Sequence, residues 1–293
     1  MLSDVLDVLA DPIDGSALHA ESDGAILRSE TGHSYVVSPD GYVVLAGDNG
    51  LRYTGDDYSM IAAREVFLSR GHFAPFVEAV SDAVGDALDD AEARGFAPSE
   101  NPVITEIGAG TGYYLAHNLD SIAGSRGVGI DVSVHAAKHL SQCHPHAGAV
   151  VADAWSRLPL LDQSVDAITV VFSPRNAAEF ARVLKPGGEV VVLTATRGHL
   201  SELRAPLGII DVEEGRVERM IAQAASHLEP VKEPELVEFE MNLDQLSIAE
   251  QIGMSPSARH IHPDVLNERI ADLPTRMTVT ARAMLTRLRV KNV

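Results

Sequence analysis

The most constraining feature of this chain is a glycine-rich turn that follows an apolar run. Val103–Ile107 predicts a buried strand, Gly108–Gly112 a sharp turn, and the residues from Tyr113 onward the start of a helix. Glycine is favoured where the backbone turns sharply and a ligand approaches the main chain, because a Cβ would collide there. Strand, glycine turn and helix together predict a nucleotide-type binding loop.

Two acids follow at the spacing that a bound nucleoside requires. Gly127–Ile130 predicts a second buried strand, and Asp131 comes directly after it. This acid lies about 20 residues beyond the glycine turn, where it would reach a ribose diol. Ala149–Ala152 predicts a third strand that leads into Asp153. Asp153 is placed to meet an adenine amino group, or alternatively is a turn acid at the end of the strand.

Two further elements extend this order. A fourth strand ends at Phe172, and Val183–Val192 combines a helix end, a Pro-Gly-Gly turn and a fifth strand. In this order the elements, over about residues 102–194, resemble the class I S-adenosylmethionine-dependent methyltransferases. An NAD-binding loop would favour Gly-x-Gly-x-x-Gly, whereas this chain has Gly-x-Gly-x-Gly preceded by Glu106.

A closer resemblance comes from the segment before the glycine turn. The matching residues there are Gly55, Asp56, Met60, Ala63, Arg64, Phe67, Leu68, Gly71, His72, Phe73 and Pro75. With Tyr113, Tyr114 and Met254–Arg259, they resemble the 23S rRNA (guanine-N1)-methyltransferases nearly end to end. The resemblance implies an α/β, Rossmann-like sheet, mostly parallel with an antiparallel last strand, and a small N-terminal β module. It also implies S-adenosyl-L-methionine as cofactor and guanine N1 of ribosomal RNA as target.

The N-terminal residues 1–50 depart from that family. Short β-like pieces there predict a small antiparallel module: Ala25–Leu27, Ser34–Val37 and Tyr42–Leu45. Family members carry a zinc site of three cysteines and a histidine in this module. The matching positions here are Asp11, Asp14, Ser29 and His33. Because oxygen groups do not reproduce a thiolate zinc site, we predict a degenerate zinc ribbon that is free of metal.

The rest of the chain divides into a helical cap and a catalytic domain. Residues 51–100 predict a helical linker or cap, with helices over Gly55–Leu68 and Ala74–Ala93. Residues 101–293 form the expected methyltransferase domain. Beyond the fifth strand we expect helices over 198–203, 213–228 and 244–252. Strands over 236–241 and 277–288 would form a closing antiparallel hairpin.

The acidic composition bears on the partners. The chain has 23 Lys and Arg against 42 Asp and Glu, a formal charge of −19, which argues against a uniformly basic nucleic-acid surface. Apolar runs are too short for a membrane span, and the N-terminus lacks a basic-then-apolar signal. We therefore expect a cytoplasmic enzyme without a membrane partner. Its partner would be ribosomal RNA, with a homodimer left open.

The expected cofactor contacts combine the glycine turn with the strand-end acids. They are Glu106, Gly108, Ala109, Gly110, Thr111, Gly112, Tyr113, Asp131, Val132, Asp153 and Ala154. By the resemblance, main-chain groups of the turn lie against the methionine portion, and Glu106 fixes the loop or meets the cofactor amine. Asp131 takes the ribose hydroxyls, and Asp153 with Ala154 takes the adenine edge.

Candidate substrate contacts lie beyond the fourth strand and in the helical cap. They are Arg64, His72, Ser173, Arg175 and Asn176. Arg64 alternatively forms a helix-surface ion pair, and Asn176 alternatively caps a helix. The polar-Pro-Pro-aromatic motif of many amino-directed methyltransferases is missing after strand four, which agrees with a ring-nitrogen target. No residue stands out as a general base.

Two other functions compete with RNA methylation. The acidic charge and the missing cysteines favour a small-molecule methyltransferase, and a cofactor-binding protein without RNA activity is the third possibility. An enclosed apolar pocket would support the former, and an obstructed glycine loop the latter. A basic patch at the cleft mouth would support RNA, and its candidate members are Arg64, Arg70, Arg175, Arg197, Arg204 and Arg259.

Overall fold

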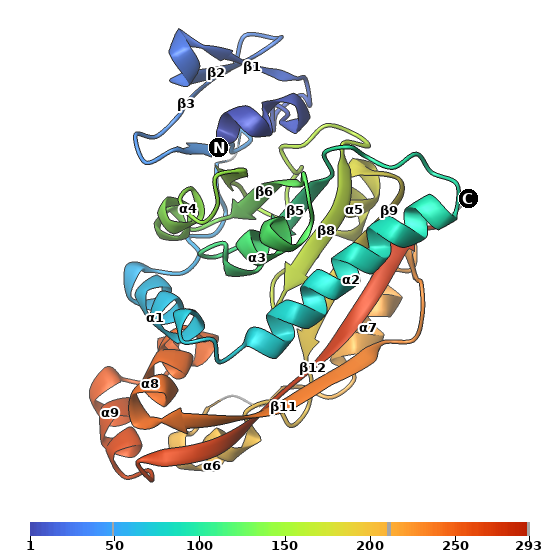
Figure 1. Ribbon diagram of the computed structural model, residues 1–293. Coiled ribbons are helices and arrows are strands. Elements are labelled where there is room, and N and C mark those ends of the chain that lie inside the picture. Colours follow the sequence, from blue (N-terminus) through green and yellow to red (C-terminus); the bar gives the residue numbers. More distant parts are fainter. Residues whose placement is uncertain (49, 210–211, 292–293) are drawn as a thin grey trace.

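One large twisted sheet organises the molecule (Figure 1). The computed structural model describes residues 1–48, 50–209 and 212–291. Within them the strand order is β10-β12-β9-β8-β5-β6-β7-β4, and β11 also pairs with β12. The strands of this sheet are β4 Tyr42–Val44, β5 Val103–Ile107, β6 Arg126–Asp131, β7 Ala147–Val151, β8 Val165–Val171, β9 Leu184–Ala195, β10 Leu228–Pro230, β11 Glu235–Asp244 and β12 Arg276–Val290.

The pairing confirms the predicted fold class. Strands β4 to β9 pair in parallel, whereas β12 runs antiparallel to β9, β10 and β11. All five residues of β5 are buried, as in a parallel strand that is covered on both faces. Because parallel strands end at the same edge, the loops after β5, β6, β7 and β8 come together there.

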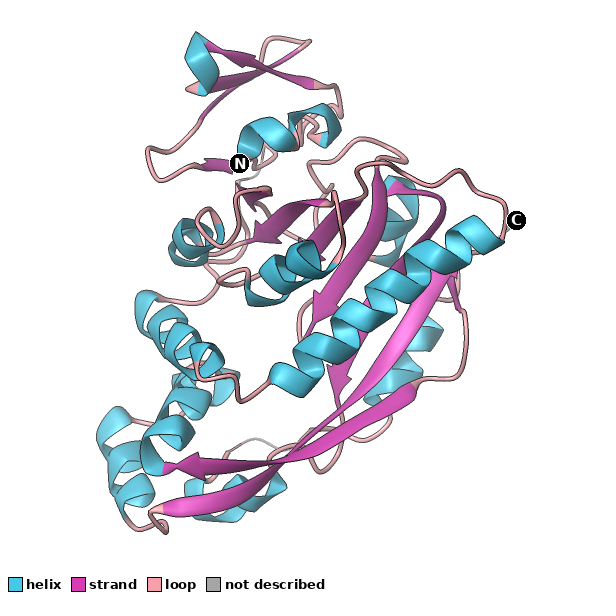
Figure 2. Ribbon diagram, viewed as in Figure 1, coloured by secondary structure: helices cyan, strands magenta, loops and turns pink. Residues whose placement is uncertain are grey.

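Helices cover both faces of the sheet (Figure 2). They are α1 Tyr58–Ser69, α2 Ala74–Ala93, α3 Tyr113–Ser121, α4 Val134–Leu140, α5 Ala177–Val183, α6 Arg204–Leu207, α7 Arg216–Ala224, α8 Gln245–Gly253 and α9 Pro263–Ala271. Alternating residues of β9 pack against the helices on the two opposite faces of the sheet. Val191 and Leu193 pack in the cluster that contains α2, α3 and α4, and Val190 and Val192 in the cluster that contains α5 and α7.

The N-terminal module lies at one end of the molecule (Figure 1). Its antiparallel strands are β1 Leu18–Glu21, β2 Ile26–Ser29 and β3 Ser34–Val36. The third predicted piece of the module belongs elsewhere, because Tyr42–Val44 forms β4 and pairs in parallel with β7 at the edge of the large sheet. Val43 and Leu45 are fully or nearly fully buried there, and a small module offers no comparable apolar surface.

The helical cap follows the sequence pattern closely. Helix α1 begins at Tyr58 because the Asp57 side chain accepts a hydrogen bond from Met60 N and so caps the helix. Helix α2 has the predicted bounds. Helices α1 and α8 pack together beside the carboxyl edge of the sheet. No helix in the described ranges is long and apolar enough to cross a membrane.

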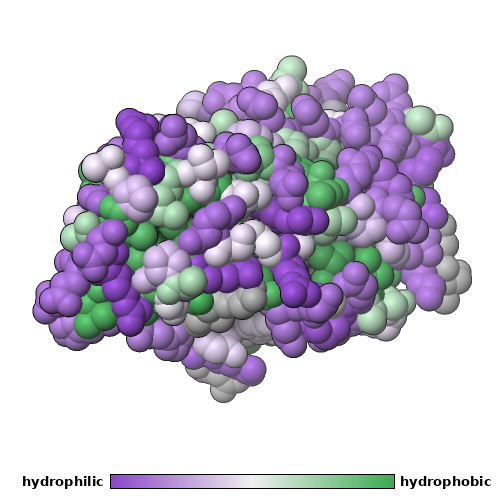
Figure 3. All heavy atoms as spheres, turned by 90° about the horizontal axis from the view of Figure 1, so that it is seen from below, coloured by the Kyte–Doolittle hydropathy of each residue, from purple (hydrophilic) through white to green (hydrophobic). Residues whose placement is uncertain are grey.

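The C-terminal third differs in detail from the prediction. The expected helix over 198–203 is a short 3-10 turn, Ser201–Leu203, that continues into α6. The expected helix over 213–228 ends at Ala224, because Leu228 enters strand β10. Strands β11 and β12 form the predicted antiparallel pair, with α8 and the unpredicted α9 between them in the chain. Hydrophilic residues predominate on the face seen in Figure 3, with hydrophobic ones gathered in small groups.

Candidate functional site

A cleft of about 720 Å³ opens at the carboxyl ends of the parallel strands. Its floor carries the glycine turn after β5 and the acids that end β6 and follow β7. Its roof comes from α1 and from the segment Gln251–Ser257 that ends α8. The loops after β8 and β9 and the start of α7 close its far side. The sheet thus brings together segments that lie far apart in the sequence.

The glycine turn is held against β6 by its own backbone. Gly108 N and Ala109 N donate to the carbonyl oxygen of Ile130 at 2.8 and 3.1 Å, and Gly110 N donates to Asp131 Oδ2 at 2.8 Å. Gly108 has a φ of +70°, and a Cβ on it would lie 2.5 Å from Ser173 Cβ. The turn therefore needs glycine for both its conformation and its close approach to the next loop.

A Gly108→Ala substitution is expected to weaken binding of S-adenosyl-L-homocysteine by about tenfold or more. The added methyl group strains the left-handed backbone and displaces Ser173, which together cost on the order of 1–3 kcal/mol at the loop. Isothermal titration calorimetry measures this change. Gly32→Ala is the matched control, because Gly32 also has a positive φ of +100° but has nothing within 4 Å of the added carbon. Equal effects of both variants on cofactor affinity would contradict a specific role for the turn.

Asp131 ties the turn to the end of β6. Its other carboxylate oxygen, Oδ1, accepts a hydrogen bond from Ser133 N at 2.8 Å. Burial raises the pKa of this carboxyl, and the two backbone donors oppose that shift. Asp131 and Val132 line the cleft beside the turn, as a ribose contact requires.

Glu106 is the most unusual acid of the site. It is 1% exposed, lines the cleft, and its Oε2 has no hydrogen-bond partner within the described parts of the chain. Burial raises its pKa to about 8. A buried acceptor without a donor is costly, so this atom fits a ligand that supplies a proton donor or a positive charge.

The remaining predicted cofactor contacts divide into two groups. Ala109, Thr111, Tyr113, Asp153 and Ala154 line the cleft, as do Gly108 and Gly110. Gly112 does not. It is the N-cap residue of α3, and a Cβ on it would lie 2.6 Å from Cys143 Sγ. Asp153 also makes the turn contacts of the alternative interpretation, accepting from Trp155 N at 2.9 Å and from Ser156 Oγ at 3.3 Å.

Of the three predicted substrate contacts that follow β8, two line the cleft and one does not. Ser173 and Arg175 line the cleft, and Ser173 Oγ donates to the carbonyl oxygen of Ile107. Asn176 does not line it, since its side chain caps α5 by accepting from Glu179 N and donating to Ala154 O. The helix-cap alternative therefore describes its geometry.

Of the two candidates from the helical cap, Arg64 lines the cleft and His72 does not. Arg64 lines the cleft, where it pairs with Asp56 at 2.5 Å and donates to Met254 O at 3.2 Å. His72 lies outside the cleft lining. Its Nε2 contacts Ser247 Oγ at 3.0 Å and its ring packs on Phe67. Burial lowers the pKa of His72, as in a packed, neutral histidine.

Sequence reasoning missed several polar or aromatic residues of the cleft. Trp155, His199, Arg216 and Gln251 all line it. Burial among aromatic rings lowers the pKa of His199 to about 4, and its Nδ1 accepts from Arg282 N at 3.0 Å, which places the ring proton on Nε2. Trp155 directly follows Asp153 and Ala154, so only this residue had a local sequence signal.

Comparison with known proteins identifies the family. Residues 105–192 match the model described as "Methyltransferase domain". The "Putative 23S rRNA (guanine-N(1)-)-methyltransferase" of Micromonospora griseorubida is 38% identical over 297 residues, which covers 99% of each chain. The chain belongs to the 23S rRNA (guanine-N1)-methyltransferase family. The 23S rRNA (guanine(748)-N(1))-methyltransferase of Streptomyces fradiae is 35% identical over 89% of each chain.

As a member of this family, the protein is an S-adenosyl-L-methionine-dependent methyltransferase, which confirms the predicted enzyme class and cofactor. Among solved structures, a SAM-dependent methyltransferase from Thiobacillus denitrificans in complex with S-adenosyl-L-homocysteine is 14% identical. That match covers 73% of this chain and 91% of the other, with a TM-score of 0.44.

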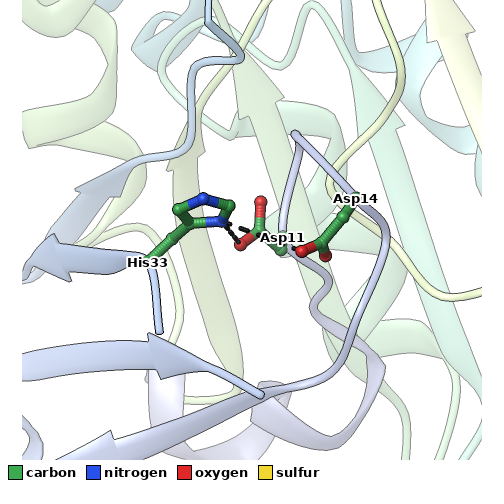
Figure 4. A group of neighbouring side chains, drawn as sticks. All are labelled: Asp11, Asp14 and His33. Atoms are coloured by element: carbon green, nitrogen blue, oxygen red, sulfur yellow. Dashed lines mark hydrogen bonds and ion pairs between the residues drawn. The ribbon is translucent and has the colours of Figure 1, made fainter. Parts of the chain in front are cut away.

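Three of the four positions that match the family's zinc ligands, Asp11, Asp14 and His33, form a cluster (Figure 4). Ligand atoms of Asp11, Asp14 and His33 lie within 4.8 Å of one another. Their oxygens already have donors: Asp11 accepts from His33 Nδ1 at 2.7 Å and from Tyr35 at 2.9 Å, and Asp14 from Thr31 at 2.5 Å. The bond to Asp11 raises the pKa of His33, which favours the protonated ring over a metal-binding one. This cluster does not fit the family's thiolate zinc site.

Metal removal is therefore expected to leave the module intact. Treatment with EDTA and 1,10-phenanthroline should not change the melting temperature, because hydrogen bonds to Asp11 hold these turns together. Asp11→Ala should lower the unfolding free energy by about 1–3 kcal/mol, since it strands buried donors. Glu21→Ala is the control, because it removes an exposed acid of the same module. An equimolar zinc ion in the purified protein would contradict this account.

Proposed function

We propose that this protein transfers a methyl group from S-adenosyl-L-methionine to N1 of a guanine in 23S rRNA, and that it acts in the cytoplasm, where ribosomal RNA is found. The observation that carries the proposal is a cleft with a nucleoside-type floor and a separate polar far side. It occurs in a chain that aligns over nearly its whole length with relatives named for this reaction.

The floor of the cleft would hold the cofactor. Glu106 offers its unpaired oxygen to the ammonium group, and the narrow glycine turn admits the methionine portion. Asp131 lies where the ribose hydroxyls are expected, and Asp153 with Ala154 where the adenine edge is expected. When bound, S-adenosyl-L-methionine supplies an electrophilic methyl group on a sulfonium. The chain's own contribution is to align this floor with the substrate side.

The roof and the far side of the cleft offer groups that match the edge of guanine. Gln251 is buried, and its Oε1 has no partner among the described residues, so it can accept from a ring N1–H or an amino group. His199 carries its proton on Nε2 and can donate to the exocyclic O6 carbonyl of guanine. With a pKa of about 4, it is too weak a base to take the N1 proton near neutral pH. These residues would therefore orient the base, and the proton would leave to solvent.

The test uses tritiated S-adenosyl-L-methionine and 23S rRNA from a strain that lacks this enzyme. The expected result is label in the RNA that nucleoside analysis identifies as N1-methylguanosine, with a primer-extension stop at the modified base. Label in a metabolite extract but not in RNA would replace the proposal with the small-molecule alternative. Cofactor binding by calorimetry without label in either fraction would support a binding protein that lacks this activity.

A further inference from the structure

A second cavity of about 410 Å³ adjoins the cofactor cleft. The two cavities share a rim, which is formed by Trp155, Phe172, Ser173, Pro174, Arg175 and Arg216. Below the rim the second cavity is mainly apolar, with Val190, Val192, Met220, Leu228 and Leu288 in its wall. A chain-like ligand that crosses the rim would therefore occupy both cavities at once.

Two arginines, Arg175 and Arg216, lie at this rim. In the ranges that the structure describes, neither Arg175 nor Arg216 forms an ion pair, and Arg175 Nε has no hydrogen-bond partner. Arg175 Nη2 contacts only a hydroxyl, Thr194 Oγ1, at 3.3 Å. Burial and then the nearby charge of Arg216 lower the pKa of Arg175. Two neighbouring cations that have no acidic partner in the described part of the chain favour an anionic ligand.

The other arginines of the suggested basic patch are already engaged. Arg64 and Arg259 both pair with Asp56, and Arg70 pairs with Asp244. Arg197 pairs with Glu214. Arg204 also has a partner, since its Nη2 donates to the carbonyl oxygen of His199 at 3.2 Å. Among these arginines and Arg216, the charge that is unpaired within the described ranges therefore lies at the shared rim. This concentration matters in a chain with a formal charge of −19, which otherwise repels nucleic acid.

Trp155 adds an aromatic surface at the same place. It is the single tryptophan of the chain and is 54% exposed. Its backbone is fixed, because Trp155 N donates to Asp153 Oδ1 at 2.9 Å. No ring contact of its side chain occurs among the residues described. Exposed aromatic rings beside cationic side chains are the usual platforms for unstacked bases of single-stranded RNA.

We propose that this rim binds the nucleotide next to the methylated guanine in single-stranded RNA, with its base on Trp155 and the connecting phosphate between Arg175 and Arg216. The assignment rests on the proposed RNA function and adds the subsite that positions the strand. A phosphodiester at the rim places one nucleotide in each cavity, so that the guanine enters the cofactor cleft while its neighbour enters the second cavity. Gln223, which lines that cavity, offers an amide to the neighbouring base.

The test measures binding of a fluorescein-labelled, single-stranded RNA decamer with one central guanine by anisotropy, with S-adenosyl-L-homocysteine present. Trp155→Ala and Arg216→Gln are each expected to weaken RNA binding by about tenfold. Arg216→Gln should also reduce the slope of log K against log salt by about 0.7, whereas Trp155→Ala should leave it unchanged. Trp155→Phe should retain most of the affinity because it keeps an aromatic face.

The matched control is Arg219→Gln, three residues along α7. Arg219 carries the same charge, pairs with Glu213 at 2.7 Å and lines neither cavity, so its loss should leave RNA affinity nearly unchanged. Calorimetry with S-adenosyl-L-homocysteine tests the other explanation, in which Trp155 contacts the adenine of the cofactor. A tenfold loss of cofactor affinity in Trp155→Ala, with RNA affinity intact, would assign Trp155 to the adenine pocket and overturn the proposal.

The failure of this inference is distinguishable from failure of the proposed function. If the natural protein labels 23S rRNA while the rim variants bind and label RNA normally, the subsite is wrong and the function stands. If the natural protein neither binds the RNA decamer nor labels 23S rRNA, the proposed function itself fails, and the subsite with it.

Discussion

Replacing Arg287 with methionine is expected to lower the free energy of unfolding by about 3–5 kcal/mol, as is typical when one partner of a buried ion pair is removed. Arg287 lies on β12 and is 4% exposed. Its Nε donates to Glu189 Oε2 at 2.8 Å, and its Nη2 pairs with Asp90 of α2 at 2.5 Å. The variant leaves Glu189, which is fully buried on β9, with only Arg94 at 3.1 Å.

The cost should come mainly from the carboxylate left behind. Burial raises the pKa of Glu189, and the charge of Arg287 opposes that shift, so the variant should favour a protonated Glu189. Urea unfolding followed by circular dichroism measures the loss. Arg289→Met is the matched control, two residues along the same strand, where an exposed pair with Glu229 contributes about 1 kcal/mol or less. The double variant Arg287→Met with Glu189→Gln should recover much of the stability that Arg287→Met loses. If Arg287→Met lost no more stability than Arg289→Met, this account would be contradicted.

Local patterns predicted several elements of the fold. Three of the five residues of Val103–Ile107 are Val or Ile, and a proline and a glycine turn bound the segment, so the strand could be placed without knowledge of its neighbours. Helix α2 has an apolar face at helical spacing, a proline near its start and glycine beyond its end, and its bounds agree with the prediction. Asp131 was placed by its distance from the turn, and the structure joins it to Gly110 by a hydrogen bond.

Long-range assembly explains what sequence patterns missed. Tyr42–Val44 has the alternation of a small-module strand, yet β7, about a hundred residues later, provides the edge that it pairs with. The pairing of His72 with Ser247 depends on how α1 and α8 pack, which no local spacing reports. Likewise, Arg175 and Arg216 approach each other only because the loop after β8 and the start of α7 meet at one rim.

Glu106→Gln is expected to stabilise the ligand-free protein at pH 8 by as much as about 5 kcal/mol, because the folded pKa of about 8 stands far above the ordinary value of 4.5. Below pH 4.5 the carboxyl is protonated in both states, so its ionisation adds no cost there. As pH rises from 4.5 to about 8, the unfolded chain loses this proton while the folded one retains it. The stability of the natural protein therefore falls across that window. Glutamine has no proton to lose, so melting curves of the two proteins should converge near pH 4 and diverge toward pH 8.

The same substitution should weaken binding of the cofactor while it stabilises the folded protein. At pH 7 the free Glu106 carboxyl is mainly protonated, and an ammonium group placed beside its unpaired oxygen would favour the carboxylate. Binding of S-adenosyl-L-homocysteine should then release about one proton, which calorimetry detects by repeating the titration in two buffers of different ionisation enthalpy. Glu106→Gln should abolish this release and reduce affinity by roughly 10- to 100-fold, since a hydrogen bond to a charged group is lost.

A surface acid provides the control for this proton count. Glu65→Gln removes an exposed carboxylate of α1 that lies 3.6 Å from His139, so both proton release and cofactor affinity should match the natural protein. If proton release persisted in Glu106→Gln, the group that titrates on binding would be another residue of the cleft. A variant that gained stability at pH 8 but kept its cofactor affinity would show that the buried carboxyl strains the fold without serving the ligand. Glu106 is thus expected to destabilise the ligand-free protein and to strengthen binding of a cationic ligand. Melting curves across pH measure the first effect, and calorimetry measures the second.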